Sequence, residues 1–232
     1  MLFRQLFDTE SSTYTYLIAD ADERVAALVD PVAERLERDL KLLDELDLRL
    51  LYSIETHIHA DHITAASELR RITRCTNVVP ENANIPCADR FVGDGEILAV
   101  GAVQIVALAT PGHTDSHMAY TVNGDRVLTG DALFIRGCGR TDFQNGDAGA
   151  LYDSVTQKLF TLPNDTLVYP GHDYHGHTVS TVAEERRHNP RFGSRSRDQF
   201  VTFMDQLGLP LPKKIMEAVP ANEQCGRITV TS

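Results

Sequence analysis

The order of predicted elements indicates an α+β protein of the αββα type, in which two packed mixed β-sheets carry helices on the outside. Strand-like and helix-like segments follow one another as strands, helix, strand–helix, strands, helix, strand, helices. That order suits two sheets packed face to face. A Rossmann fold is disfavoured because too many strands follow one another without a crossover helix. The 232 residues, of which 42% are hydrophobic, are enough for one core. We therefore expect a single domain over residues 1–232, with a short helical extension from about residue 178.

Each element follows from composition and spacing, in chain order. β-rich runs predict strands over 2–7, 13–19 and 25–30. A helix is predicted over 31–46, where Pro31 stands at the start and apolar residues recur three and four apart. The remaining predicted strands are 48–56, 76–80, 96–100, 103–110, 117–122, 126–130 and 165–171, and the remaining predicted helices are 63–73, 147–162, 178–188, 197–208 and 212–219.

Charge and hydropathy exclude two classes of partner. The formal net charge is −11, which argues against nucleic acid because phosphate contacts need a basic face. No apolar run approaches the roughly 20 residues of a membrane span. The N-terminus lacks the features of a secretory signal, so we expect a cytoplasmic protein, or one of the mitochondrial matrix if a transit peptide precedes this sequence. We also expect a homodimer.

The four cysteines are scattered along the chain without a CxxC pair. Cys75, Cys87, Cys138 and Cys225 are therefore expected to be free thiols of a reducing compartment. Cys138 and Cys225 are expected to be buried structural thiols, which are more common than redox-sensitive ones.

Polar clusters follow directly on four apolar strands. They read "THIHADH", "TPGHTDSH", "GDALF" and "PGHDYHGH". Loops at the ends of core strands are held by a rigid scaffold and are free to carry function. If the four loops end on one edge, they bring together His57, His59, Asp61, His62, His113, Asp131 and His172. Imidazole and carboxylate ligands without thiolate suit Zn, Fe or Mn, so the pattern predicts a metal site, and the spacing leaves the number of ions open.

The motifs "THIHADH", "TPGHT", "GDALF" and "YPGHDY" together resemble the metallo-β-lactamase superfamily, from about Thr13 to Thr178. Two glutathione-using families of that superfamily compete, glyoxalase II and the persulfide dioxygenases (ETHE-type sulfur dioxygenases). The segments "RGCGRTDFQ", "THIHADHITAA", "YPGHDYHGHTVSTVAEERRHNPR" and "AVPANEQCG" resemble the persulfide dioxygenases. The chain is also short for the helical C-terminal domain of glyoxalase II.

The resemblance implies an oxidoreductase of sulfide detoxification, which oxidises glutathione persulfide with O2 and water to sulfite and glutathione. It implies one Fe(2+) per chain, held at the catalytic centre by His57, His113 and Asp131. Two histidines and one carboxylate leave positions open for O2 and substrate. His59, Asp61, His62 and His172 then become outer residues that orient the ligands by hydrogen bonds.

Three residues are candidates for binding the substrate. Tyr174 and Arg191 match family positions that contact glutathione, and the planar arginine fork suits a carboxylate. Arg140 either braces the metal loop through Asp142 or touches the substrate.

Two other functions compete with persulfide oxidation. One is a glyoxalase II-like hydroxyacylglutathione thioester hydrolase with a dinuclear metal site, in which a metal-bound hydroxide attacks the carbonyl. The other is a non-catalytic metal-binding protein, against which the intact set of ligand residues argues.

Overall fold

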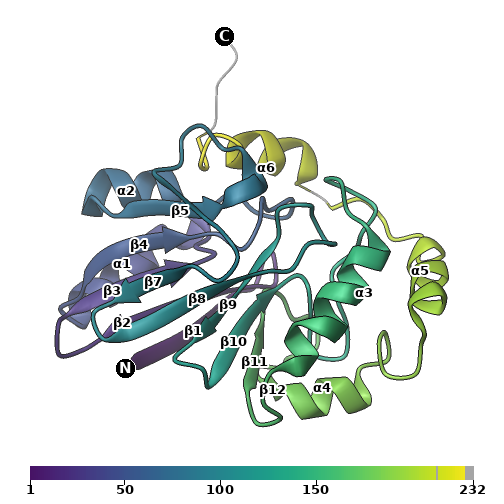
Figure 1. Cartoon of the computed structure of the whole chain (residues 1–232). Helices are drawn as coiled ribbons and strands as arrows, with labels where there is room; N and C mark the ends of the chain where they lie inside the picture. Colours follow the sequence, from purple (N-terminus) through teal and green to yellow (C-terminus); the bar gives the residue numbers. More distant parts are fainter. Residues whose placement is uncertain (213, 228–232) are drawn as a thin grey trace. The chain divides into compact units, whose positions relative to one another are not determined.

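The computed structural model describes residues 1–212 and 214–227, and the chain divides into two compact units (Figure 1). The first unit comprises residues 1–92, 99–104 and the segment from Leu211 onward, and the second comprises 93–98 and 105–210. The first unit is thus assembled from three separate stretches of chain. The single domain over 1–232, of which residues 213 and 228–232 lie outside the described residues, stays a prediction, as does its helical extension from about residue 178.

The sheet of the first unit has its strands in chain order. They are β1 (Leu2–Asp8), β2 (Thr13–Asp20), β3 (Val25–Val29), β4 (Arg49–Ile54), β5 (Thr76–Pro80) and β6 (Arg90–Val92). β1 to β3 pair antiparallel, and β4 to β6 continue the sheet in parallel. Every residue of β2 and β3 is buried, as expected of central strands.

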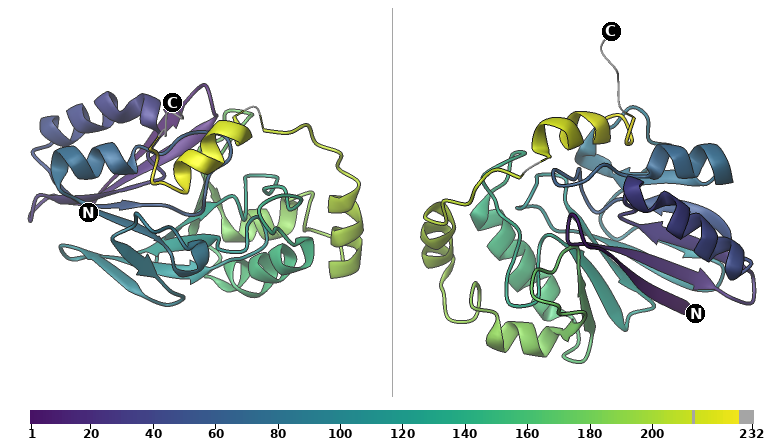
Figure 2. Two further views of the ribbon diagram at one scale, coloured as in Figure 1. Left: turned by 90° about the horizontal axis from the view of Figure 1, so that it is seen from above. Right: turned by 180° about the vertical axis from the view of Figure 1, so that it is seen from behind.

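Helices α1 (Leu36–Glu45) and α2 (Ala66–Thr73) lie side by side in the first unit (Figures 1 and 2). Leucines three and four apart on α1 form one apolar stripe, and Leu43 packs in the same core cluster as Leu69 of α2 and Leu28 of β3. The unit also contains η1 (Ala33–Arg35), η2 (Glu81–Ala83) and α6 (Ile215–Asn222).

The second sheet has the order β12-β11-β10-β9-β8-β7. Its strands are β7 (Ile97–Val100), β8 (Val103–Ala109), β9 (Met118–Val122), β10 (Arg126–Gly130), β11 (Leu167–Pro170) and β12 (Ser180–Thr181). β10 and β11 are parallel, while β8, β9 and β10 pair antiparallel. A parallel neighbour requires a crossover, and the chain between β10 and β11 contains α3 (Ala148–Gln157) and η3 (Leu159–Thr161).

Helices α3, α4 (Val182–His188) and α5 (Arg197–Asp205) complete the second unit. Asp147 caps α3 through the N–H of Ala150, and Ser196 and Gln199 form a capping box on α5. α3 and α5 share a core cluster that contains Leu151 and Phe200. None of the helices in the described part of the chain has the length and hydropathy that a bilayer crossing needs.

The two mixed sheets with helices confirm the predicted fold class, and the local differences have identifiable causes. The helix predicted over 178–188 begins only at Val182, because Ser180 and Thr181 pair with β11 and the Thr181 side chain caps the helix. The helix predicted over 212–219 runs from Ile215 to Asn222. The short strand β6 was not predicted.

The expectation of four free thiols was wrong for two of them. Cys87 and Cys225 form a disulfide across a sequence separation of 138 residues, with their Cα atoms 6.1 Å apart. The pairing is invisible in the sequence because it depends on α6 returning to the segment after β5 (Figure 1). Cys75 and Cys138 are free, as expected, and both are buried, which was expected of Cys138.

Candidate functional site

The segment Thr56–Thr64, here called the histidine loop, leaves the end of β4 in the first unit. It carries four of the predicted site residues, and His57, His59 and His62 are each at most 2% exposed. The ring centroids of His57 and His59 are 4.1 Å apart, and those of His59 and His62 are 4.3 Å apart. The structure therefore brings these three imidazoles together, as the motif predicted.

The ring of His57 is oriented by a chain of hydrogen bonds behind it. The Thr56 hydroxyl donates to Asp30 Oδ2 at 2.8 Å, and its oxygen is then left to accept from His57 Nδ1 at 2.9 Å. With Nδ1 protonated, Nε2 of His57 carries the lone pair. This is the arrangement that a metal-binding histidine adopts.

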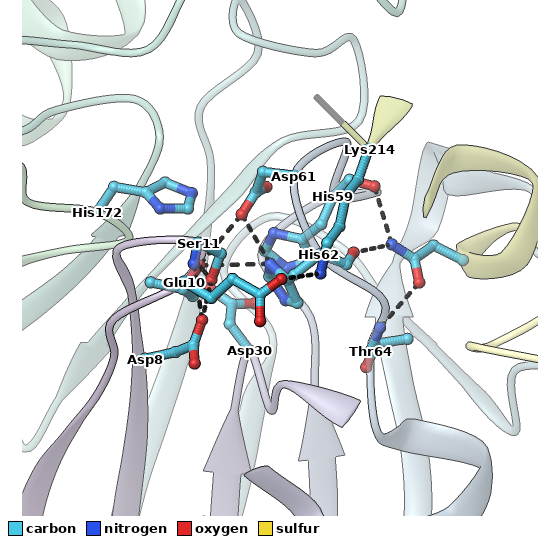
Figure 3. A network of polar contacts seen from close by, with 12 residues as sticks. Asp8, Glu10, Ser11, Asp30, His59, Asp61, His62, Thr64, His172 and Lys214 are labelled. Carbon is cyan, nitrogen blue, oxygen red and sulfur yellow. Dashed lines mark hydrogen bonds and ion pairs between the residues drawn. The ribbon is translucent and has the colours of Figure 1, made fainter. Parts of the chain in front are cut away.

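His59 is enclosed by two carboxylates. Its Nε2 lies 3.0 Å from Asp30 Oδ1 and 3.3 Å from Glu55 Oε2 (Figure 3 shows Asp30 beside His59). Burial favours the neutral ring, but Asp30 and Glu55 outweigh it and raise the pKa of His59 well above its usual range. Burial also opposes ionisation of Asp30, yet the charge and hydrogen bond of His59 lower the pKa of Asp30. Burial raises the pKa of Glu55.

Asp61 and His62 form the outer part of the histidine loop (Figure 3). His62 Nδ1 lies 2.9 Å from Asp61 Oδ2, and the Thr13 hydroxyl donates to the same carboxylate oxygen at 3.1 Å. One ligand atom from each of His59, Asp61 and His62 lies within 4.8 Å of the others, so this trio has the geometry to hold a metal ion.

Asp131 follows β10 in the second unit and meets two of the predicted histidines. Its carboxylate oxygens lie 3.5 Å from His113 Nε2 and 3.4 Å from His172 Nε2. His113 Nδ1 donates to the carbonyl of Arg140 at 2.7 Å, which turns Nε2 toward Asp131. Gly139 passes close behind, because a Cβ there would lie 2.5 Å from the Asp131 carbonyl. The sequence prediction that these strand-end loops converge is confirmed for these three residues.

His117 is a further residue of this cluster that the sequence reading missed. Its Nε2 accepts the backbone N–H of Asp131 at 3.0 Å, and its Nδ1 donates to the Thr110 hydroxyl at 2.8 Å. A signal was present, because the antiparallel register that pairs Leu128 with Tyr120 pairs Asp131 with His117 when continued by three residues. This signal can be used only if the turn after β9 is identified in the sequence, because that turn sets the register of the hairpin.

The structure places the three predicted substrate residues in the second unit. Tyr174 is 64% exposed, and its ring stacks on His172 with centroids 6.1 Å apart. Arg191 lies over the Phe203 ring, 5.3 Å from its centroid, and no carboxylate pairs with its guanidinium in the part of the chain that the structure describes. Arg140 is engaged by the carboxylate of Asp142 through Nε at 2.6 Å and NH2 at 2.7 Å. The geometry therefore favours the bracing alternative for Arg140.

Cys138 lies in the core beneath this region. Its burial raises the pKa of the Cys138 thiol to about 12, which leaves no thiolate for metal binding or redox chemistry near neutral pH. The expectation of a buried structural thiol holds for this residue.

Each unit contains buried donor atoms that suit metal binding. His59 Nδ1, His62 Nε2 and Asp131 Oδ1 are buried without a hydrogen bond in the described part of the chain. Buried polar atoms are normally paired. A cation would satisfy His62 Nε2 and Asp131 Oδ1, and it would satisfy His59 Nδ1 when that ring is neutral. The donor set contains imidazole nitrogens and carboxylate oxygens only, which suits a divalent ion of the first transition row.

Comparison with known proteins places this chain in a family. A family model described as the metallo-beta-lactamase superfamily matches residues 8–172. The human mitochondrial persulfide dioxygenase ETHE1 is 49% identical over 234 residues, covering 100% of this chain and 91% of the human protein. The crystal structure of ETHE1 from Myxococcus xanthus matches with a TM-score of 0.95 and 57% identity, covering 98% of this chain and 100% of that chain.

The rival glutathione-using family is more distant. A hydroxyacylglutathione hydrolase of Rhodopseudomonas palustris is 32% identical over 214 residues, covering 89% of this chain and 79% of that protein. The resemblance inferred from the motifs is therefore confirmed, together with the fold that it implied. The chain belongs to the metallo-β-lactamase superfamily and, within it, to the persulfide dioxygenases, a family of oxidoreductases.

Proposed function

We propose that this protein oxidises glutathione persulfide with O2 and water, releasing sulfite and glutathione, and so acts in sulfide detoxification. The observation that carries the proposal is the 49% identity to a persulfide dioxygenase across 100% of this chain. The likeness therefore extends beyond residues 8–172, which the superfamily model matches, and the fold alone would not decide the function. The homodimer and the cytoplasmic or mitochondrial location stay predictions.

The proposed cofactor is one Fe(2+) per chain, held by His57, His113 and Asp131. The hydrogen bonds of the two histidines support this assignment. Both histidines donate through Nδ1, to the Thr56 hydroxyl and to the Arg140 carbonyl respectively, so both present Nε2. When bound, iron held by two histidines and one carboxylate supplies O2 activation next to the substrate sulfur. The protein supplies the ligand geometry.

The remaining polar residues orient that geometry. Asp30 and Glu55 hold Nε2 of His59, and Asp61 holds Nδ1 of His62. In the second unit His172 contacts the carboxylate of Asp131. We propose that these four outer residues, His59, Asp61, His62 and His172, fix ligand and water positions by hydrogen bonding.

Substrate binding is assigned to Arg191 and Tyr174. Glutathione carries two carboxylates, and the protein has a net charge of −11, so a local cation is needed to hold it. Arg191 has no carboxylate partner among the described residues, which leaves its guanidinium available for a bidentate bond. Arg140 is already engaged by Asp142, so we give it the bracing role.

One observation favours the hydrolase as a second candidate. The trio of His59, Asp61 and His62 has the geometry for an ion of its own, and a dinuclear site suits thioester hydrolysis by a metal-bound hydroxide. Metal analysis combined with an oxygen electrode separates the two functions. We expect close to one iron per chain and O2 consumption only when a persulfide is supplied. Two zinc ions per chain, with rapid hydrolysis of S-lactoylglutathione and no O2 uptake, would overturn the proposal.

A further inference from the structure

The side chain of Asn222, at the end of α6, is bonded entirely to the backbone of the histidine loop. Its Nδ2 donates to the carbonyls of His59 and His62, both at 2.8 Å. Its Oδ1 accepts the N–H of Thr64 at 2.9 Å. We propose that Asn222 is a positioning residue, which fixes the backbone of the histidine loop and thereby the direction of its metal-binding side chains.

The amide of Asn222 fits this task in a way that few side chains can. Both N–H groups and the oxygen are used, and the residue is 3% exposed, so water cannot replace these partners. Only one orientation of the amide works, because the flipped one would set its oxygen against two carbonyl oxygens. The histidine loop has no helix or strand of its own between Thr56 and Ile63, so its backbone groups depend on such partners.

The carbonyls that Asn222 holds flank the outer part of the loop. His59 and His62 stand on either side of Asp61, and the three residues form the trio described above. A backbone held at both ends of this short segment restricts where the Asp61 and His62 side chains can point. His57 lies two residues before the first of these carbonyls, so the proposed iron ligand shares the same restraint.

The segment around Asn222 is itself fastened to the first unit. The carbonyl of Cys225 accepts the N–H of Ser67 at 3.0 Å, and the disulfide joins Cys225 to Cys87. At the other end of α6, Lys214 Nζ pairs with Glu10 at 3.0 Å (Figure 3) and with Glu34 at 2.9 Å. Because these contacts order α6 independently of the histidine loop, Asn222 meets the loop with its side chain already placed.

The inference rests on the proposed metal role of the histidine loop, but its first test does not use metal or activity. In metal-free protein, the exchange rate of the Thr64 amide with deuterium reports directly on the bond to Asn222 Oδ1. Asn222→Ala removes all three bonds. Asn222→Asp keeps the volume and the acceptor but faces two carbonyls with a carboxylate.

Asn189 offers a matched control. It is 1% exposed, its Nδ2 donates to the carbonyls of Phe134 at 3.2 Å and Gly137 at 3.0 Å, and its Oδ1 accepts the N–H of Arg191 at 2.9 Å. Asn189→Ala therefore removes a buried amide with the same kind of partners in the second unit. Comparing it with Asn222→Ala separates loss of loop restraint from general destabilisation.

Asn222→Ala should exchange the Thr64 amide about 10- to 100-fold faster than wild type, and Asn189→Ala should leave that rate unchanged. Zinc-loaded Asn222 variants should also release metal to a chelator about 10- to 100-fold faster. If a variant does not fold, the exchange rate of the Thr64 amide in wild type still tests the proposal. Fast exchange of that amide in wild type overturns it. Wild-type metal release from Asn222→Asp also overturns it, because the two bonds that Nδ2 donates would then be dispensable. Failure of the persulfide assay with these exchange results intact would reject the proposed function alone.

Discussion

His117 holds the backbone of Asp131 from behind, with Nε2 accepting the Asp131 N–H at 3.0 Å. The imidazole is 1% exposed, and its other nitrogen is tied to Thr110, so its position does not depend on solvent. The contact makes His117 an indirect support of a proposed iron ligand.

His117→Ala should weaken metal binding without removing a ligand. The Asp131 N–H loses its acceptor, so the backbone that carries the Asp131 carboxylate is no longer fixed. We therefore expect about a 10- to 100-fold fall in metal affinity. Competition with a chelator measures this affinity. His117→Asn, which keeps an acceptor at a shorter reach, should recover part of the loss. Wild-type affinity in His117→Ala would remove the supporting role.

The number of metal ions is tested by three variants of the histidine loop. His57→Ala should strip iron and abolish turnover, because it removes one of three proposed ligands. Asp61→Ala and His62→Ala should keep most of the metal and lose about 10- to 100-fold in activity. Metal-to-protein ratios of the three variants, measured beside wild type, decide the question. A fall from two ions to one in Asp61→Ala would mean a dinuclear site.

Arg191→Ala should raise KM for glutathione persulfide more than it lowers kcat. A charge-assisted bond to a remote carboxylate contributes about equally in the ground and transition states, and its loss costs roughly 1.5–3 kcal/mol, or one to two decades. Arg195 is the matched control, because its guanidinium lies 4.2 Å from the centroid of the same Phe203 ring. Steady-state kinetics should show little change in Arg195→Ala. Equal effects of the two variants would mean that aromatic packing, and not substrate binding, is what Arg191 supplies.

Cys87→Ser should lower the free energy of unfolding. The disulfide closes a separation of 138 residues, and loss of such a crosslink typically costs about 2–5 kcal/mol. Urea denaturation without reductant measures the difference. A thiol reductant should shift the wild-type midpoint toward that of Cys87→Ser and leave the variant unchanged. If the urea midpoint of wild type is the same with and without reductant, the crosslink does not contribute to stability.

The stability supplied by Asp20 should depend on pH. The N–H of Ala102, followed by those of Glu23 and Asp22, donates to this carboxylate, and together they lower the pKa of Asp20 below its ordinary value of 3.8. Because the folded state binds the proton more weakly, the contribution is present above that value and is lost as pH falls through the folded pKa. Urea titrations at several pH values should show the advantage of wild type over Asp20→Asn shrinking below about pH 4. A constant difference would contradict the assignment.

The sequence was informative where a residue acts close to its own strand. The motif at His57 and the motif at Asp131 each follow a buried strand, so strand-end reasoning located both. Lys214, Asn222 and Cys225 were not found, because their partners lie more than a hundred residues away. Such contacts depend on the complete path of the chain, which local periodicity does not contain.

The chemical type of a residue also limits what can be predicted from the sequence. Imidazoles and carboxylates suggest metal binding by their nature, whereas a lone asparagine or a histidine that accepts a backbone N–H has no distinctive neighbours in sequence. The motif also does not determine the number of metal ions, because the sequence is the same whether His59, Asp61 and His62 bind a metal ion or orient the residues that do. The metal content of the variants described above decides between the two alternatives.

The position of Asn222 along the chain has a consequence for biosynthesis. A ribosome makes the carbonyls of His59 and His62 about 160 residues before the amide that binds them, and residues 105–210 of the second unit are translated in between. The histidine loop of the nascent first unit therefore emerges before Asn222 can bind it, and contacts such as those from Thr13, Asp30 and Glu55 can hold it at that stage. On the proposed role of Asn222, the bonds that fix the histidine loop can therefore form only after the second unit has been translated.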